Sequence, residues 1–274
     1  MKRIAVFALA LALFLALALS AGAAGFRTLD EIRAQGRITI GVFSDKKPFG
    51  YVDERGQYQG YDVVLAQRLA QDLGVELELV SVDAPNRIEF LQAGKVDVIL
   101  ANFTYTPERA EQVDFALPYM KVALGVVSPE GALIASEAEL AGKSIIVSKG
   151  TTAETYFEAN HPDVRLVKYD SYTEAYIGLL DGRGDGLSTD NTEVLAWALE
   201  NPGFAVGIES LGSLDTINPA VSKGNDTLRA WIDEDIRKLG EERFFHAAYE
   251  QTLRETYGPA ADADSLVVEG GVIE

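Results

Sequence analysis

The sequence predicts an α/β protein of two doubly wound lobes, and three observations support this. Short apolar runs rich in β-branched residues alternate with amphipathic segments of helical period, which is the pattern of βαβ units. The order strand, helix, strand, helix, strand, polar turn, helix occurs over residues 37–109 and again over residues 144–199. The chain of 274 residues also exceeds the usual size of one domain, so two lobes are expected.

In the first half, residues 61–73 form the best-defined expected helix. Their apolar side chains recur at helical spacing, and Gly74 follows as a stop signal. Strands are expected on both sides of this helix, and a short helix opened by Pro85 leads to a third strand. The expected strands are residues 37–42, 75–82 and 96–100. These elements make a βαβαβ unit with right-handed crossovers.

The second half repeats this layout after an extended segment, residues 120–127, that carries the chain out of the first sheet. The expected strands are residues 144–147, 164–167 and 184–187, and the expected helices are residues 151–160, 171–180 and 192–199. Two terminal helices, residues 226–239 and 242–257, have apolar faces that need a surface to cover. We expect them to return to the first lobe, and we expect a loose tail after them because periodicity is lost.

The ends of the chain complete the expected division. A charged start, an apolar run of 16 residues from Ile4 and a patch of small residues predict a secretory signal peptide. An uncleaved membrane anchor is the alternative, although the apolar run is short for a span. The expected parts are a signal peptide (1–24), the first part of lobe 1 (25–120), lobe 2 (121–215), the return to lobe 1 (216–260) and a C-terminal tail (261–274). The mature protein is then soluble and exported to the periplasm.

Composition excludes several kinds of function. The formal net charge of −18 opposes binding to nucleic acid and to anionic lipid. The absence of Cys excludes disulfides, thiol catalysis and a lipid-modified N-terminal Cys. His161 and His246 lack metal-ligand spacing, so no metal site is expected. The glycine-containing stretches at residues 142–144 and 182–186 do not have the spacing of phosphate or dinucleotide loops, so no cofactor is expected.

The polar stretch after the third strand is the first candidate site. Thr106 suits a helix N-cap, and Pro107 then falls at the first helical position. Arg109 therefore lies in the first turn, where a cation opposes the helix dipole. This placement indicates that an anion binds nearby. The alternative is an ordinary surface arginine paired with Glu108 or Glu111.

Two further strand ends carry polar clusters, and ligands of open α/β sheets bind at such ends. The first is residues 148–152, where a strand runs into a helix start with free backbone N–H groups. The second is residues 188–190. For Asp190 the alternative is a capping box with Glu193, three residues further on.

One carboxylate among sites that favour anions suggests a ligand that carries both charges. A zwitterion would place its carboxylate on Arg109, with Thr104 and helix N–H groups, and its ammonium on Asp190. Phe49 and Tyr51 are candidates for the apolar side of the cleft, although core packing of Phe49 beside Pro48 is an equal alternative. Arg87 is a candidate contact for the ligand side chain, with a plain surface charge as the alternative.

Seven short motifs together resemble one family. They are residues 36–42, Pro48-Phe49, residues 60–63, residues 94–97, the segment from Thr104 to Arg109, residues 113–119 and Lys149-Gly150-Thr151. In their joint spacing they are similar to family 3 of the periplasmic solute-binding proteins, which serve ABC importers of polar amino acids. The resemblance implies the type II periplasmic-binding-protein fold, in which two α/β lobes joined by two hinge strands close on the ligand. Hinges are then expected near residues 119–123 and 213–217.

The resemblance also implies roles for individual residues. Arg109 and Thr104 would hold the α-carboxylate, with the backbone at Asn102 and Thr152, and Asp190 would hold the α-ammonium. The adjacent Thr151 belongs to the same expected ligand-binding set. Where glutamine binders carry aromatic residues against the ligand, this chain has Lys46 and Ala84. The segments 84–88 and 99–104 are more similar to cysteine-binding and acidic-amino-acid-binding members.

The functional expectation is a monomeric binding protein, without enzyme activity, that delivers one free amino acid to a membrane permease. Cysteine is favoured, followed by glutamate or aspartate. A periplasmic lyase or dehydratase on the same scaffold is one alternative, and it would need a spare acid or base in the cleft. A sensor subunit that presents its ligand to a receptor kinase is another.

Overall fold

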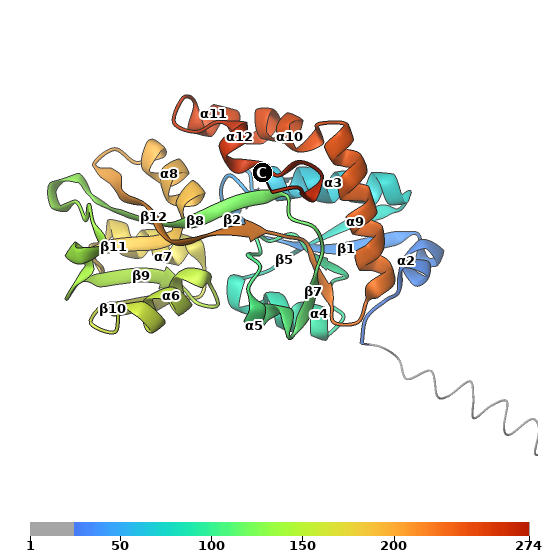
Figure 1. The fold of residues 1–274 in the computed structure, drawn as a ribbon, viewed down its shortest axis with the longest axis horizontal. Coiled ribbons are helices and arrows are strands. Elements are labelled where there is room, and N and C mark those ends of the chain that lie inside the picture. Colours follow the sequence, from blue (N-terminus) through green and yellow to red (C-terminus); the bar gives the residue numbers. More distant parts are fainter. Residues whose placement is uncertain (1–24, 274) are drawn as a thin grey trace, which may run out of the picture.

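The computed structural model describes residues 25–273 and contains two mixed five-stranded sheets, one in each lobe (Figure 1). The expected signal peptide lies outside the described residues. The first sheet has, in spatial order, β5 (Glu76–Ser81), β1 (Arg37–Val42), β6 (Val98–Ile99), β13 (Ala220–Ser222) and β7 (Val113–Phe115). The second has β10 (Arg165–Tyr169), β9 (Ser144–Ser148), β11 (Gly186–Asp190), β8 (Met120–Pro129) and β12 (Phe204–Ile217). The prediction of two α/β lobes is confirmed.

Each sheet is parallel where the βαβ units form it and antiparallel where the chain crosses between lobes. In the first sheet, β5, β1 and β6 are parallel to one another, and β13 pairs antiparallel with both β6 and β7. In the second sheet, β10, β9 and β11 are parallel to one another, and β8 pairs antiparallel with both β11 and β12. A small antiparallel sheet of β2 (Asp45–Lys46), β3 (Gly50–Val52) and β4 (Tyr58–Gln59) follows β1.

Helices cover both lobes. The first lobe carries α2 (Leu29–Gln35), α3 (Tyr61–Leu73), η1 (Ala84–Asn86), α4 (Arg87–Gln92), α5 (Pro107–Ala110), α9 (Asp226–Glu241), α10 (Phe244–Thr252), α11 (Arg254–Tyr257), α12 (Ala263–Leu266) and η4 (Glu269–Gly271). The second carries η2 (Glu130–Ala132), η3 (Glu137–Leu140), α6 (Thr152–Asn160), α7 (Tyr172–Leu180) and α8 (Asn191–Glu200). None of the helices in residues 25–273 has the length and apolar character needed to span a bilayer.

Strands β8 and β12 run side by side from one lobe to the other (Figure 1). Met120 pairs with Ile217, and Lys121 pairs with Thr216, at the point where both strands reach the first lobe. The Tyr119 N–H also donates to the Ile217 carbonyl oxygen. The expected hinge segments and lobe boundaries fall in this strand pair, and bending at these positions stays a prediction.

The terminal helices cover the first lobe. Leu228, Ile232 and Ile236 of α9 are fully buried in the same core cluster as Ile38 of β1 and Leu69 of α3. This burial explains the amphipathic period of α9, whose other face is charged. The second lobe has its own smaller core clusters between its sheet and helices.

The expectation of a loose tail is wrong for the C-terminal segment. Leu266, Val267 and Val268 are at most 9% exposed, and Val267 forms a β-bridge with Met120 at the start of β8. The Val268 N–H donates to the Tyr119 carbonyl oxygen. The segment is a single apolar triplet between polar residues, which is too short to show a period, so the sequence pattern could not reveal its burial.

Two matched substitutions test this packing. Val268→Ala removes two buried methyl groups beside the hinge strand and should lower the free energy of unfolding by roughly 1 to 2.5 kcal/mol. Val272→Ala, on a side chain that is 65% exposed, should leave it unchanged. Chemical denaturation of both variants measures the difference, and equal stabilities would mean that the segment does not pack as described.

Candidate ligand-binding site

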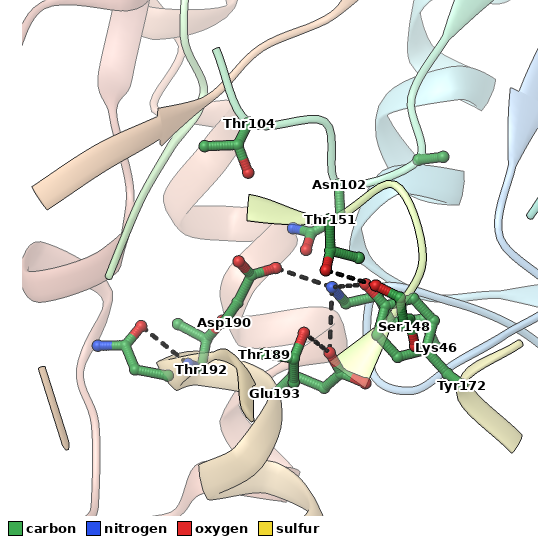
Figure 2. Close-up of polar contacts among 12 residues, drawn as sticks. Lys46, Asn102, Thr104, Ser148, Thr151, Tyr172, Thr189, Asp190, Thr192 and Glu193 are labelled. Carbon is green, nitrogen blue, oxygen red and sulfur yellow. Dashed lines mark hydrogen bonds and ion pairs between the residues drawn. The ribbon is translucent and has the colours of Figure 1, made fainter. Parts of the chain in front are cut away.

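The polar strand ends of the two lobes face each other, and they supply most of the site (Figure 2). Asn102 follows β6 in the first lobe, while Thr151 follows β9 and Asp190 ends β11 in the second. Lys46 comes from β2 of the first lobe. The close approach of the lobes is visible at Gly150, where an added Cβ would lie 2.7 Å from the Pro85 Cα.

Arg109 lies where the sequence predicted it, in the first turn of a capped helix. The Thr106 side chain accepts a hydrogen bond from the Arg109 N–H, and Pro107 is the first helical residue. The Arg109 Nη1 donates to the Thr104 carbonyl oxygen at 2.7 Å, and its Nη2 donates to the Gly150 carbonyl oxygen at 2.9 Å. Arg109 therefore bridges the two lobes through backbone oxygens.

A second guanidinium reaches the same carbonyl. The Arg87 Nη2 donates to the Gly150 oxygen at 3.0 Å, and its other nitrogens donate to the carbonyl oxygens of Ala84, Ala101 and Asn102. Arg87 is only 3% exposed, so the alternative of a surface charge is wrong. Its role is to brace the turn after β6, because most of its donors are used on backbone oxygens.

The two guanidiniums carry positive charge without a nearby counter-charge. Within residues 25–273, no carboxylate lies within 4.0 Å of Arg87 or Arg109, so pairing of Arg109 with Glu108 or Glu111 is not formed. Burial, and next the charge of Arg87, lower the pKa of Arg109 to about 9. Arg109 remains protonated at neutral pH, and this end of the site favours an anion.

A buried ion cluster lies at the other end. The Lys46 Nζ is 2.7 Å from the Asp190 Oδ2, 3.0 Å from the Glu193 Oε2 and 3.1 Å from the Tyr172 hydroxyl (Figure 2). Lys46 is 1% exposed. Burial opposes its charge, but Asp190 and Glu193 outweigh this effect and raise the pKa of Lys46 well above its ordinary value.

The capping box considered for Asp190 is not formed. Asp190 is the N-cap residue of α8, but its side chain makes no capping hydrogen bond. Glu193 instead accepts from the Thr189 hydroxyl at 2.9 Å and from Lys46, and it is 1% exposed. Because Lys46 arrives from the other lobe and takes both carboxylates, local sequence could not predict this pairing. Burial raises the pKa of Glu193 to about 7.

Several buried polar side-chain atoms around these charges have no hydrogen-bond partner within the described chain. They include both amide atoms of Asn102, the hydroxyl oxygens of Ser148 and Thr192, and the Glu193 Oε1. Buried polar groups are rarely left unpaired, so such a group of them points to a ligand that pairs with them. Asn102 also has a positive φ of 43°, an unusual backbone conformation that sets the direction of its side chain.

Three further expected residues, Thr104, Thr151 and Thr152, lie near the positive end of the site. Thr104 is 3% exposed, and Thr151 caps α6 by accepting from the Glu154 N–H, so that Thr152 begins this helix at the site. Arg109 and Thr152 also line a groove of about 700 Å³ between the lobes. These positions agree with an anion at the α6 N-terminus, and ligand contact by each residue stays a prediction.

Phe49 and Tyr51 require a correction. Phe49 is fully buried in the main core cluster of the first lobe, as its alternative interpretation held. Tyr51 lies on a different groove with Lys47 and Glu200. The aromatic neighbours of Lys46 are instead Phe43 and Tyr172. Their two rings pack edge to face, with 5.4 Å between the ring centroids.

Asp62 is a further residue that the sequence interpretation missed. It is fully buried, accepts from the Asn102 N–H at 2.8 Å and accepts from the Tyr119 hydroxyl at 2.7 Å. It therefore ties the turn that carries Asn102 to the start of the hinge strand. The motif Gly60-Tyr61-Asp62 held the only sequence signal, an acidic residue on the apolar side of an amphipathic helix.

Comparison with known proteins identifies the family. Residues 38–255 match the model of the bacterial extracellular solute-binding proteins, family 3. This chain belongs to that family. The prediction of a family 3 solute-binding protein is therefore confirmed.

Solved structures and relatives are similar over most of the chain. A cysteine-binding protein from Campylobacter jejuni is 52% identical with a TM-score of 0.86, and the match covers 88% of this chain and 98% of that one. A solute receptor for L-cysteine from Neisseria gonorrhoeae is 50% identical with a TM-score of 0.87, covering 89% and 100%. The ABC transporter glutamine-binding protein GlnH of Bacillus subtilis is 30% identical, covering 83% and 85%. A relative from Pseudomonas aeruginosa named cyclohexadienyl dehydratase is 31% identical, covering 60% and 63%.

The buried position of Asp62 predicts a pH dependence. Burial raises its pKa from 3.8 to about 7, so between these values the folded state keeps a proton that the unfolded chain has released. The stability that this retained proton contributes is fully present below 3.8, the pKa of Asp62 in the unfolded chain, and it is lost as pH rises through about 7, the pKa of Asp62 in the folded protein. From about pH 5 to about pH 8, the wild type should therefore lose stability relative to Asp62→Asn.

Denaturation at several pH values measures this difference. Asp72→Asn, on the same helix but in a partly exposed pair with Arg68, serves as the matched control and should keep the pH slope of the wild type. If Asp62→Asn also keeps that slope, Asp62 does not hold a proton in the folded protein near neutral pH.

Proposed function

We propose that this protein captures one free amino acid by closure of its two lobes and delivers it to an ABC importer. The observation that carries the proposal is the pair of opposite charges held by separate lobes. Arg109 has no carboxylate partner within the described residues, and Asp190 has Lys46 on Oδ2 while its other oxygen has no hydrogen bond there. A zwitterion satisfies both ends, with its carboxylate at Arg109 and its ammonium at Asp190.

L-Cysteine is the ligand that we favour, followed by glutamate and aspartate. The main support is likeness to two structures described as cysteine receptors, at 52% and 50% identity over nearly the whole chain. Micromolar affinity would correspond to about −8 kcal/mol. Two charge-assisted contacts in a partly desolvated site can supply this free energy after the cost of closure.

The family and the sequence support the following setting. The protein is exported through its N-terminal signal peptide, acts in the periplasm as a monomer and meets a membrane permease as its protein partner. Its binding chemistry requires no cofactor or metal, because the charged side chains and the α6 N-terminus suffice for a zwitterion. Its net charge of −18 disfavours nucleic acid as a partner.

The ligand preference is tested by calorimetry on protein stripped of ligand by unfolding and refolding. L-Cysteine, kept reduced, should bind more tightly than L-glutamate, L-aspartate, L-glutamine, L-arginine and L-cystine. Tight binding should also raise the melting temperature, because the ligand binds only the folded state. Tighter binding of another amino acid would replace cysteine in the proposal, and no binding by any of them would refute it.

Arg109→Ala tests the anion end of the site. We expect at least about a tenfold loss of amino-acid affinity with the fold intact, because a charge-assisted contact to the carboxylate is removed. Arg183→Ala is a suitable control, since Arg183 is exposed and pairs with its neighbour Asp181. Unchanged calorimetric binding by Arg109→Ala would remove Arg109 from the site.

A second candidate function is a lyase or dehydratase activity. The sequence offered no spare acid or base for it, but Glu193 is a buried carboxyl group at the site with a pKa raised to about 7, and a named dehydratase is among the relatives. Against this activity, the Glu193 Oε2 is already held by Lys46 and Thr189. Incubation with amino acids and with cyclohexadienyl acids, followed by product analysis, distinguishes the two functions, and turnover would establish the enzyme.

A further inference from the structure

The ion cluster around Lys46 gathers three charged side chains from two lobes in one buried place. Lys46, Asp190 and Glu193 are 1%, 5% and 1% exposed. Removing one partner from such a cluster leaves an uncompensated buried charge, which is strongly unfavourable. The number of charges in the cluster therefore restricts which ligands can bind beside it.

Lys46 has no donor left for a ligand. A lysine ammonium has three N–H donors. Its Nζ lies within hydrogen-bond or ion-pair distance of three acceptors, the Asp190 Oδ2, the Glu193 Oε2 and the Tyr172 hydroxyl. Its influence on the ligand is therefore through charge, and it acts as a positioning residue for Asp190.

When Glu193 is ionised, the cluster has one net negative charge, since two carboxylates face one ammonium. That charge is matched by a single further cation, which the proposed function identifies as the α-ammonium of the ligand. A ligand with a second cation in its side chain would bring a like charge beside Lys46, and both carboxylates of the cluster are already paired with Lys46.

We propose that Lys46 determines ligand specificity by neutralising one of the two buried carboxylates, so that the site accepts amino acids with one ammonium group and excludes basic amino acids. The inference rests on the proposed function, because it assumes that an α-ammonium binds at Asp190. It predicts that specificity changes in opposite directions when a charge of either sign is removed from the cluster.

Three variants test the inference. Lys46→Met removes the cation with little change of shape, Glu193→Gln removes one carboxylate isosterically, and the double variant removes both. Affinities for L-cysteine, L-aspartate, L-ornithine, L-lysine and L-arginine are measured by calorimetry on stripped protein at about pH 8, above the Glu193 pKa of about 7, so that most of Glu193 is ionised. Circular dichroism verifies that each variant is folded.

The expected results are changes in affinity ratios. In Lys46→Met, the affinity for the tightest-binding basic amino acid should rise relative to the affinity for L-cysteine by at least about tenfold. The reason is that the second cation of this ligand replaces the missing Lys46 ammonium. In Glu193→Gln, the affinity for L-aspartate should rise relative to the affinity for L-cysteine by a similar factor, because the cluster has lost a negative charge. In the double variant both ratios should return toward those of the wild type, because the net charge is restored.

Lys47→Met is the matched control, since Lys47 is the neighbouring residue but is exposed and pairs with Glu200. Both ratios should stay at their wild-type values in this variant. The inference is overturned if Lys46→Met and Glu193→Gln keep both ratios within about threefold of a wild type that binds an amino acid. If Lys46→Met does not fold, the ratio in Glu193→Gln decides alone. Failure of the wild type to bind any amino acid refutes the proposed function itself, so the two failures are distinguishable.

Discussion

The arrangement of the site depends on the buried contact between Lys46 of the first lobe and Asp190 and Glu193 of the second. Burying three charged groups is costly, and their mutual attraction offsets that cost only when all three are together. Because the partners come from different lobes, the cluster is complete only while the lobes are closed. Its geometry therefore fixes how the lobes meet and which oxygen of Asp190 remains for a ligand.

Opposite ends of the site have opposite electrostatic character, and each end is built by backbone constraints as much as by charge. At the positive end, Arg87 holds the carbonyl oxygens of the turn after β6, and Arg109 is fixed by the cap of α5. At the negative end, Lys46 orients Asp190. A dipolar ligand is consequently bound in one direction only, which is a form of specificity that does not depend on the ligand side chain.

Features that depend on local sequence were predictable, and features that depend on contact between lobes were not. The strand and helix order and the capped start of α5 follow from periodicity, Thr106 and Pro107, all of which act within a few residues. The capping box considered as the alternative for Asp190 and Glu193 depends on local spacing, whereas Lys46, which pairs with both carboxylates, lies 144 positions away from Asp190 in the chain. Phe49 and Tyr51 were candidates for the cleft, and for Phe49 core packing was an equal alternative, because an aromatic residue beside a loop has the same local pattern whether it faces a core or a ligand.

Closure itself is favoured by some contacts of the chain and opposed by others. The Lys46 cluster favours it, as do the Thr173 N–H to Asp45 hydrogen bond and the Lys47–Glu200 ion pair, all of which join the lobes. Closure also places the Gly150 carbonyl oxygen of the second lobe against Arg87 and Arg109 of the first lobe, and burial, followed by the charge of Arg87, lowers the pKa of Arg109. A ligand can shift the equilibrium only by binding the closed form more tightly. An anionic group at the two arginines does so by compensating the guanidinium charge that closure buries, so the guanidiniums make closure depend on the ligand.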